Sequence, residues 1–105
     1  MILITGTVEV EAADRKAFLE VAERQITLSR QEPGCIDYAC GEDTLQPCRF
    51  TFVERWRDQA AVDEHFAQDY CREFITAVAR LATNDLLIEL LHADRVEKRP
   101  IPRAR

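Results

Sequence analysis

Residues 49–57 read Arg-Phe-Thr-Phe-Val-Glu-Arg-Trp-Arg, and this stretch decides the fold. Large apolar and polar side chains alternate over its full length, which is typical of a β-strand with one buried face. One face carries Phe50, Phe52, Glu54 and Trp56, and the other carries Thr51, Val53, Arg55 and Arg57. A glutamate therefore shares a strand face with three aromatic side chains.

Upstream of this strand, the sequence predicts two further strands and a helix. Residues 2–11 are rich in β-branched side chains and favour a strand. From residue 13 to residue 31, apolar side chains recur at spacings of three and four, which predicts an amphipathic helix. Pro33 and Gly34 end this helix, and a second strand is predicted over 35–42.

Downstream, two helical stretches and a last strand are predicted. Asp58 is the expected N-cap of a helix that runs to Phe66, and Asp69 is the expected N-cap of a second stretch to about Ala82. Residues 86–96 are apolar and then alternating, which predicts a strand. We therefore expect one domain over 1–97 and a basic tail over 98–105.

The predicted order of elements is β, α, β, β, α, β, which indicates an α+β fold with an antiparallel four-stranded sheet and its helices on one face. Ile36, Tyr38 and Cys40 are expected on one face of their strand, as are the aromatic residues of 49–57. Each such side chain is worth about 1.5–3 kcal/mol when buried, so both faces need a cover. We expect a homodimer in which two sheets pack face to face and enclose a pocket.

The composition narrows the class of protein. The chain has 105 residues, of which 47% are hydrophobic and 31% charged, a balance typical of a folded globule. No apolar run is long enough to cross a membrane, so we expect a cytoplasmic protein without membrane contact. Net charge is −5; residues 94–105 carry five basic and two acidic side chains, which leaves the rest at −8 and argues against nucleic acid. The four cysteines lack the spacing of a metal site, and we expect free thiols.

Several of these residues together resemble the antibiotic biosynthesis monooxygenase (ABM) domain family. They are, in order, Glu32-Pro33-Gly34-Cys35, Tyr38, Arg49-Phe50, Glu54-Arg55-Trp56, His65 and Phe74, and the resemblance covers about residues 1–97. It implies a ferredoxin-like fold that forms a dimeric α+β barrel. Several members oxidise quinol-like or polyketide aromatic substrates with molecular oxygen and use neither flavin, haem nor metal. The resemblance thus implies a reaction without a cofactor.

The same barrel also supports haem degradation and the isomerisation of small oxygenated metabolites. The haem-degrading branch uses an asparagine on the first strand, and residues 1–11 contain none. Many relatives carry a second histidine five residues after the one that matches His65, where this chain has Tyr70.

The residues expected to act in catalysis are His65, Trp56 and Glu54. His65 is able to accept a proton near neutral pH, although a structural histidine on a helix is the alternative. Trp56 is expected either in the core or beside a planar substrate, with its indole N–H free to donate. Glu54 is expected to act as a base if burial raises its pKa, or to pair with an arginine across the dimer.

Three aromatic residues are expected to bind the substrate: Tyr70, Tyr38 and Phe52. Tyr70 either hydrogen-bonds a substrate hydroxyl or covers the pocket with its ring, and the other two are expected to line the pocket. The leading hypothesis is a cofactor-independent monooxygenase that acts on a quinol or polycyclic phenol with oxygen. The alternatives are an isomerase of a small oxygenated metabolite and a dimer that binds a small molecule without converting it.

Overall fold

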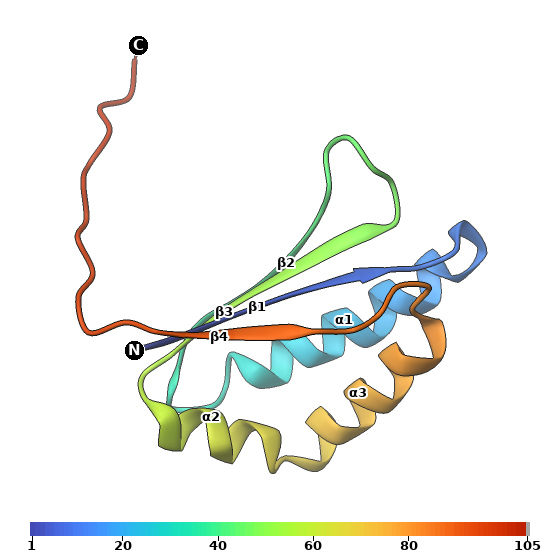
Figure 1. Cartoon of the computed structure of the whole chain (residues 1–105), viewed down its shortest axis with the longest axis horizontal. Helices are drawn as coiled ribbons and strands as arrows, with labels where there is room; N and C mark the ends of the chain where they lie inside the picture. The colour runs from blue at the N-terminus through green and yellow to red at the C-terminus, as the bar shows by residue number, and fades with distance from the viewer. Residues whose placement is uncertain (105) are drawn as a thin grey trace.

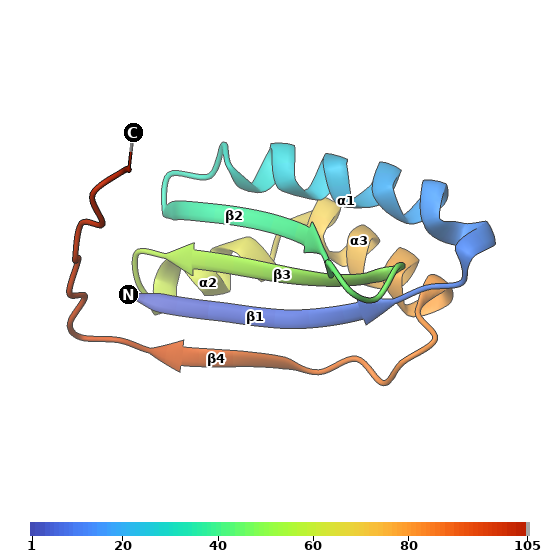
Figure 2. The same ribbon diagram turned by 90° about the horizontal axis from the view of Figure 1, so that it is seen from above.

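Four antiparallel strands form one sheet in the order β2-β3-β1-β4 in the computed structural model, which describes residues 1–104 (Figure 2). β1 spans Ile2–Glu9, β2 spans Cys35–Glu42, β3 spans Arg49–Trp56 and β4 spans Ile88–His92. β1 pairs with β3 on one side and with β4 on the other, and β2 pairs with β3. The stretch that decides the fold is thus a strand, as its alternation predicts, and it lies in the interior of the sheet.

The helices all cover one face of the sheet (Figure 1). A short 3-10 turn at Ala12–Asp14 leads into α1, which spans Arg15–Ser29; α2 spans Gln59–Phe66 and α3 spans Asp69–Leu81. The order and pairing of the elements are those of a ferredoxin-like α+β fold, as predicted. None of the helices described for residues 1–104 is long and apolar enough to cross a membrane.

The aromatic face of β3 is covered by the chain's own helices. Phe18 of α1 lies with its ring centroid 4.5 Å from that of Phe50 and 6.1 Å from that of Phe52. Trp56 has no exposed surface. The prediction that this face needs a second copy of the chain is therefore wrong, because α1 inserts a large side chain at the point where the aromatic residues gather.

β2 contains an irregularity that the sequence does not reveal. Its register with β3 shifts between Cys35 and Asp37. Tyr38 faces the helices and is 2% exposed, whereas Ile36 is 53% exposed. An extra residue reverses the alternation of a strand, so the prediction that Ile36 shares a face with Tyr38 and Cys40 is wrong.

The two helices after β3 begin in different ways. Asp58 caps α2 as predicted, because its side chain accepts a hydrogen bond of 2.8 Å from the N–H of Ala61. At α3 the N-cap is Gln68, and Asp69 is the first helical residue. Asp69 is therefore not the cap that we predicted; its carboxylate pairs with Arg72 three residues later.

β4 is shorter than the predicted strand over 86–96. Its pairing with β1 runs from Ile2–His92 to Gly6–Ile88. Beyond that point the side chain of Asn84 takes the place of a strand, because its Oδ1 accepts from the N–H of Glu9 at 2.8 Å and its Nδ2 donates to the carbonyl oxygen of Thr7 at 2.9 Å. Residues 83–87 are therefore tied to β1 without forming a ladder.

Residues 93–104 contain no helix or strand and leave the sheet on the side away from the helices (Figure 1). The domain boundary predicted after residue 97 stays a prediction. The last residue of the predicted tail, Arg105, lies outside the described residues.

Candidate functional site

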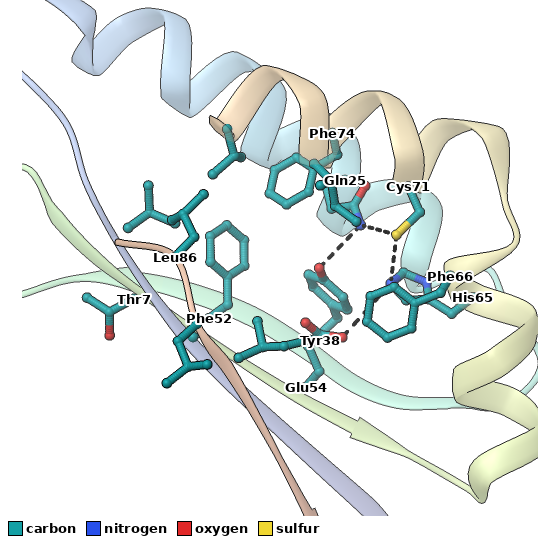
Figure 3. Close-up of a pocket in the computed structure, with 16 residues that line it drawn as sticks. Thr7, Gln25, Tyr38, Phe52, Glu54, His65, Phe66, Cys71, Phe74 and Leu86 are labelled. Carbon is teal, nitrogen blue, oxygen red and sulfur yellow. Dashed lines mark hydrogen bonds and ion pairs between the residues drawn. The ribbon is translucent and has the colours of Figure 1, made fainter. Parts of the chain in front are cut away.

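A cavity of about 220 Å³ lies between the helix-facing side of the sheet and α3 (Figure 3). Most of its wall is apolar, and its polar side chains gather at one end. It is lined by Gly6, Thr7, Val8, Gln25, Tyr38, Phe52, Glu54, His65, Phe66, Cys71, Phe74, Ile75, Val78, Leu86, Leu87 and Ile88. At the opposite end, Leu86 and Leu87 are 44% and 77% exposed, so the apolar end opens to solvent.

The polar end is built by residues from five elements. Gln25 belongs to the buried stripe of α1, at the helical spacing that also buries Phe18 and Ala22. Alternation in β3 turns Glu54 toward the helices, opposite Tyr38 of β2 in the register. α2 and α3 contribute His65 and Cys71, both about 1% exposed. The fold thus brings together side chains that are far apart in the sequence.

His65 lies between two carboxylates at this end of the cavity. Its Nδ1 is 2.6 Å from Oε2 of Glu32, and its Nε2 is 3.9 Å from Oε1 of Glu54. A carboxylate accepts hydrogen bonds, so Glu32 places the ring proton on Nδ1 and leaves the lone pair of Nε2 directed toward the cavity. Glu32 therefore orients the imidazole of His65, with Nε2 on the side of Glu54.

The carboxyl group of Glu54 holds its proton to an unusually high pH. It is 7% exposed, and burial raises its pKa to about 7, against the opposing effect of the hydrogen bond from Trp56. The indole N–H of Trp56 donates to Oε1 of Glu54 at 2.9 Å. Near neutral pH this carboxyl group is therefore divided between its acid and its carboxylate form.

Tyr38 and Phe52 line the cavity, where the sequence predicts them. The hydroxyl of Tyr38 accepts a hydrogen bond of 3.3 Å from Nε2 of Gln25. Burial raises the pKa of Tyr38, so the hydroxyl stays protonated. The ring of Phe52 meets the rings of Tyr38 and Phe74 edge to face, at centroid distances of 6.2 and 5.5 Å. These rings form an apolar wall next to the polar end.

Trp56 and Tyr70, the other two predicted aromatic site residues, do not line the cavity. Trp56 lies behind His65, with ring centroids 4.4 Å apart, and its N–H is already bonded to Glu54. Tyr70 donates its hydroxyl proton to Oε2 of Glu32. Trp56 therefore supports the ring of His65, and Tyr70 contacts the carboxylate that orients it.

Three further residues of the site were not among the predicted ones: Glu32, Gln25 and Cys71. Glu32 directly precedes Pro33 and Gly34, and the sequence there indicates the end of a helix and not a site. Gln25 is a polar residue in an otherwise apolar helix stripe, and this pattern could have marked it as a site residue. Its Oε1 has no hydrogen-bond partner among residues 1–104. Cys71 is a free thiol and gives no signal in the sequence.

Among residues 1–104, no three histidine, cysteine, aspartate or glutamate side chains lie close enough to hold a metal ion. The lining contains no lysine or arginine either. The described site thus offers proton-transfer groups and an apolar wall, without a cationic group for an anionic ligand.

The sequence matches the family described as antibiotic biosynthesis monooxygenase over residues 1–77. An uncharacterised protein of Synechocystis is 38% identical over 74 residues, which cover 70% of this chain and 50% of that protein. The chain thus spans about half the length of that relative. YcnE of Bacillus subtilis, whose name assigns it provisionally to the monooxygenases, is 28% identical over 75 residues, covering 71% of this chain and 79% of its own length.

Solved structures agree with the fold. A Deinococcus radiodurans protein, provisionally assigned as an antibiotic biosynthesis monooxygenase, superposes with a TM-score of 0.87 at 28% identity and covers 93% of this chain and 97% of its own. A Mycobacterium tuberculosis protein superposes with a TM-score of 0.84 at 22% identity, covers 92% of this chain and 98% of its own, and supports the fold alone.

Proposed function

The chain belongs to the antibiotic biosynthesis monooxygenase family, and from this premise we propose that it is a cofactor-independent monooxygenase of quinols or related phenols. The observation that carries the proposal is the base: His65, oriented by Glu32 at 2.6 Å, stands at the closed end of an apolar cavity. An electron-rich phenol needs little more than a base and an apolar cavity to react, because its anion reduces oxygen directly.

The cavity favours a small, planar and mostly apolar substrate. Its volume of about 220 Å³ lies below the roughly 300–1,000 Å³ typical of sites for drug-sized ligands. One or two fused rings therefore suit it better than a larger polycycle. Phe52 and Phe74 contact the ring, and Tyr38 lies where a hydroxyl substituent enters the polar end.

In the proposed reaction, Nε2 of His65 removes the phenolic proton and the apolar wall excludes water from the anion. The anion transfers electrons to oxygen; one oxygen atom enters the ring and the other leaves as water. A quinol plus O₂ thus gives a hydroxyquinone plus H₂O, with four electrons passing from substrate to oxygen. Glu54, 3.9 Å from the imidazole, supplies a proton for the departing water.

The other predicted residues receive roles that follow from their contacts. Trp56 holds Glu54 through its N–H and packs behind His65, so it is a positioning residue. Tyr70 acts through Glu32 in the same sense. Of the predicted site residues, His65, Glu54, Tyr38 and Phe52 line the cavity and are placed to touch the substrate.

The proposed assembly is a homodimer formed through the open face of the sheet. This face is not covered by helices (Figure 1). Val53 is 37% exposed and Leu91 is 48% exposed, and Leu3 stands beside Leu91 in the strand register. Two such faces packed together bury these side chains, and the chain after His92 leaves the sheet on the same side.

The runner-up function is an isomerase, and the pair of His65 and Glu54 favours it, since two proton-carrying groups flank one end of the cavity. The absence of lysine and arginine from the described lining disfavours a phosphorylated metabolite. Binding without turnover would instead mark a carrier.

The test is oxygen uptake by the metal-stripped protein with a panel of hydroquinones and anthrone-like phenols, after subtraction of autoxidation. We expect protein-dependent uptake that falls at least about tenfold, or about 1.4 kcal/mol, in His65→Ala. Conversion that proceeds equally well without oxygen would support the isomerase. Uptake that is unchanged in the variant would remove His65 from the chemistry.

A further inference from the structure

Cys71 is the one lining residue with a thiol, and the proposed oxygenation does not use it. Its Sγ lies 3.5 Å from Nε2 of His65 (Figure 3). The side chain is 1% exposed and lines the cavity. The sulfur is therefore approached from the cavity and not from the outer surface of the protein.

A carboxylate, an imidazole and a thiol lie in a row in the structure; they belong to Glu32, His65 and Cys71. Glu32 contacts Nδ1 of the imidazole at 2.6 Å, and the thiol lies at the opposite ring nitrogen. A nucleophile within reach of a base that a third group orients is the arrangement by which enzymes activate thiols and hydroxyls.

Gln25 supplies an independent sign that a polar ligand belongs here. Its side chain is 2% exposed, its Nε2 lies 3.7 Å from Sγ of Cys71, and its Oε1 has no hydrogen-bond partner within residues 1–104. A buried polar atom without a partner is costly, and a hydroxyl on a ligand in the cavity would satisfy it. Gln25 thus marks a place for a donating ligand hydroxyl beside the sulfur.

We propose that Cys71 is a covalent attachment site for quinone-type electrophiles that occupy the cavity. The sulfur attacks a conjugated ring carbon of the quinone and forms an S–C bond. The thiol proton passes to His65 and from there to one quinone oxygen, and the hydrogen of the attacked ring carbon moves to the other oxygen, so the ring becomes a hydroquinone thioether. The two electrons that reduce the ring are those of the sulfur nucleophile, and no other reactant is needed.

A covalent site at Cys71 is a property separate from oxygenation. Only the choice of a quinone as the electrophile rests on the proposed function, because quinones are the product class of that reaction. Burial raises the pKa of Cys71, so the resting sulfur is a thiol and must lose its proton as it attacks. The attack therefore depends on His65. A quinone product that lingers in the cavity would alkylate Cys71 and close the site to further substrate.

The experiment uses 1,4-naphthoquinone under argon, with peptide mapping of each cysteine over time. The half-exposed thiols Cys35, Cys40 and Cys48 serve as internal controls in the same molecule. We expect labelling of Cys71 to saturate as the quinone concentration rises, because binding in the cavity precedes it, and labelling of the three controls to rise linearly.

Two variants test the base. His65→Gln and Glu32→Gln are each expected to slow labelling of Cys71 at least about tenfold and to leave the control thiols Cys40 and Cys48 unchanged. Cys35 is a control for His65→Gln alone, because burial and the charge of Glu32 both raise the pKa of the Cys35 thiol. The proposal is overturned if Cys71 labels without saturation, if it does not label at all, or if neither variant slows it. If His65→Gln is unfolded, all four of its thiols will be labelled alike. In that case the Glu32→Gln variant, which keeps the imidazole, tests whether labelling of Cys71 depends on the base.

The labelling needs no turnover, so its outcome is separable from that of the oxygen-uptake assay. Oxygen uptake without saturable labelling would refute the covalent site and leave the oxygenase standing. Saturable labelling of Cys71 without oxygen uptake by any quinol would support the covalent site and refute the oxygenase.

Discussion

The carboxyl group of Glu54 lies in a setting that opposes its charge. It is 7% exposed, its described hydrogen-bond donor is the neutral indole of Trp56, and the imidazole of His65 is 3.9 Å away. Such an environment disfavours ionisation in the folded protein more than in the unfolded chain. Glu54 is therefore a residue whose contribution to stability and to proton transfer both depend on pH.

Replacing Glu54 with Gln is expected to stabilise the protein at pH 8. Burial raises the pKa of Glu54 to about 7 from an ordinary value of 4.5. The folded state thus binds a proton that the unfolded state releases, so stability is full below pH 4.5 and falls as the pH rises through 7. At about 1.4 kcal/mol per pH unit, the cost above pH 7 is roughly 3 kcal/mol.

Urea unfolding of wild type and Glu54→Gln at pH 4.5 and pH 8 measures this difference. The gain in the variant should be large at pH 8 and should shrink toward pH 4.5. A gain that is equal at both pH values would show that the carboxyl group is not the cause.

Glu32→Gln is expected to lower kcat of the proposed oxygenase at least about tenfold, with KM little changed. A glutamine amide is able to donate a hydrogen bond to Nδ1 of His65, which moves the ring proton to Nε2 and removes the lone pair from the cavity. Steady-state oxygen uptake separates the two constants. A raised KM with an unchanged kcat would instead show that Glu32 acts in substrate binding and not in the orientation of the base.

At the scale of elements, the close approach of the turn before β2 to α2 sets the distance between Glu32 and His65. Gly34, which directly precedes β2, has no room for a Cβ atom, because that atom would collide with the Cβ of Ala61 in α2. The backbone of Gly34 also accepts a hydrogen bond of 2.9 Å from the N–H of Arg57. A glycine at this position is therefore required by packing.

Gly34→Ala is expected to destabilise the protein by about 1–3 kcal/mol, because the new methyl group pushes α2 away from the sheet. Gly41→Ala in β2 is the control, since a Cβ there meets no atom of the described residues within 4 Å apart from its chain neighbours. Thermal unfolding of both variants should show a lowered Tm for Gly34→Ala alone. Equal effects in the two variants would contradict the packing argument.

Elements with a strong local pattern were predictable from the sequence, and those that depend on other parts of the chain were not. The alternation of 49–57 and the cap at Asp58 are local, and both are confirmed. The register shift in β2 and the early end of the last strand depend on pairing with β3 and β1. Asn84 ends that strand through bonds to residues 75 and 77 positions away.

The site follows the same division. The shared face of Glu54 with aromatic residues, and the lining roles of Tyr38 and Phe52, follow from strand alternation. The contact of Glu32 with His65 joins positions 33 residues apart, and that of Gln25 with Cys71 joins positions 46 apart. No spacing rule reports such contacts, so the orienting carboxylate and the nearby thiol emerge only in three dimensions.

At the scale of the whole molecule, one face of the sheet is covered by helices and the other is open. The covered face holds the aromatic cluster and the cavity, so burial of these residues does not depend on a partner. The proposed dimer rests on the open face alone. Its loss should therefore leave the monomer folded.

Val53→Asp is expected to shift the protein from dimer to monomer, because it places a carboxylate in the middle of the open face. Leu19→Asp on α1 is the matched control, since both side chains are 37% exposed and Leu19 belongs to the helix layer. Light scattering after size-exclusion chromatography gives the mass of each variant. A monomeric wild type would refute the dimer, and a dimeric Val53→Asp would place the interface elsewhere.

The exposed end of the cavity is formed by residues 86–88, which lie outside the part of the chain that matches the family. Asn84 and the short pairing of β4 with β1 attach this segment to the body, whereas His65 and Glu32 belong to the matched part. The proposed proton-transfer residues and the entrance of the cavity thus belong to different parts of the chain. Exchanging residues 83–92 for those of another family member should therefore change which ring the cavity accepts and leave the proposed proton-transfer residues in place. This segment is the part of the chain to exchange when a different substrate is wanted.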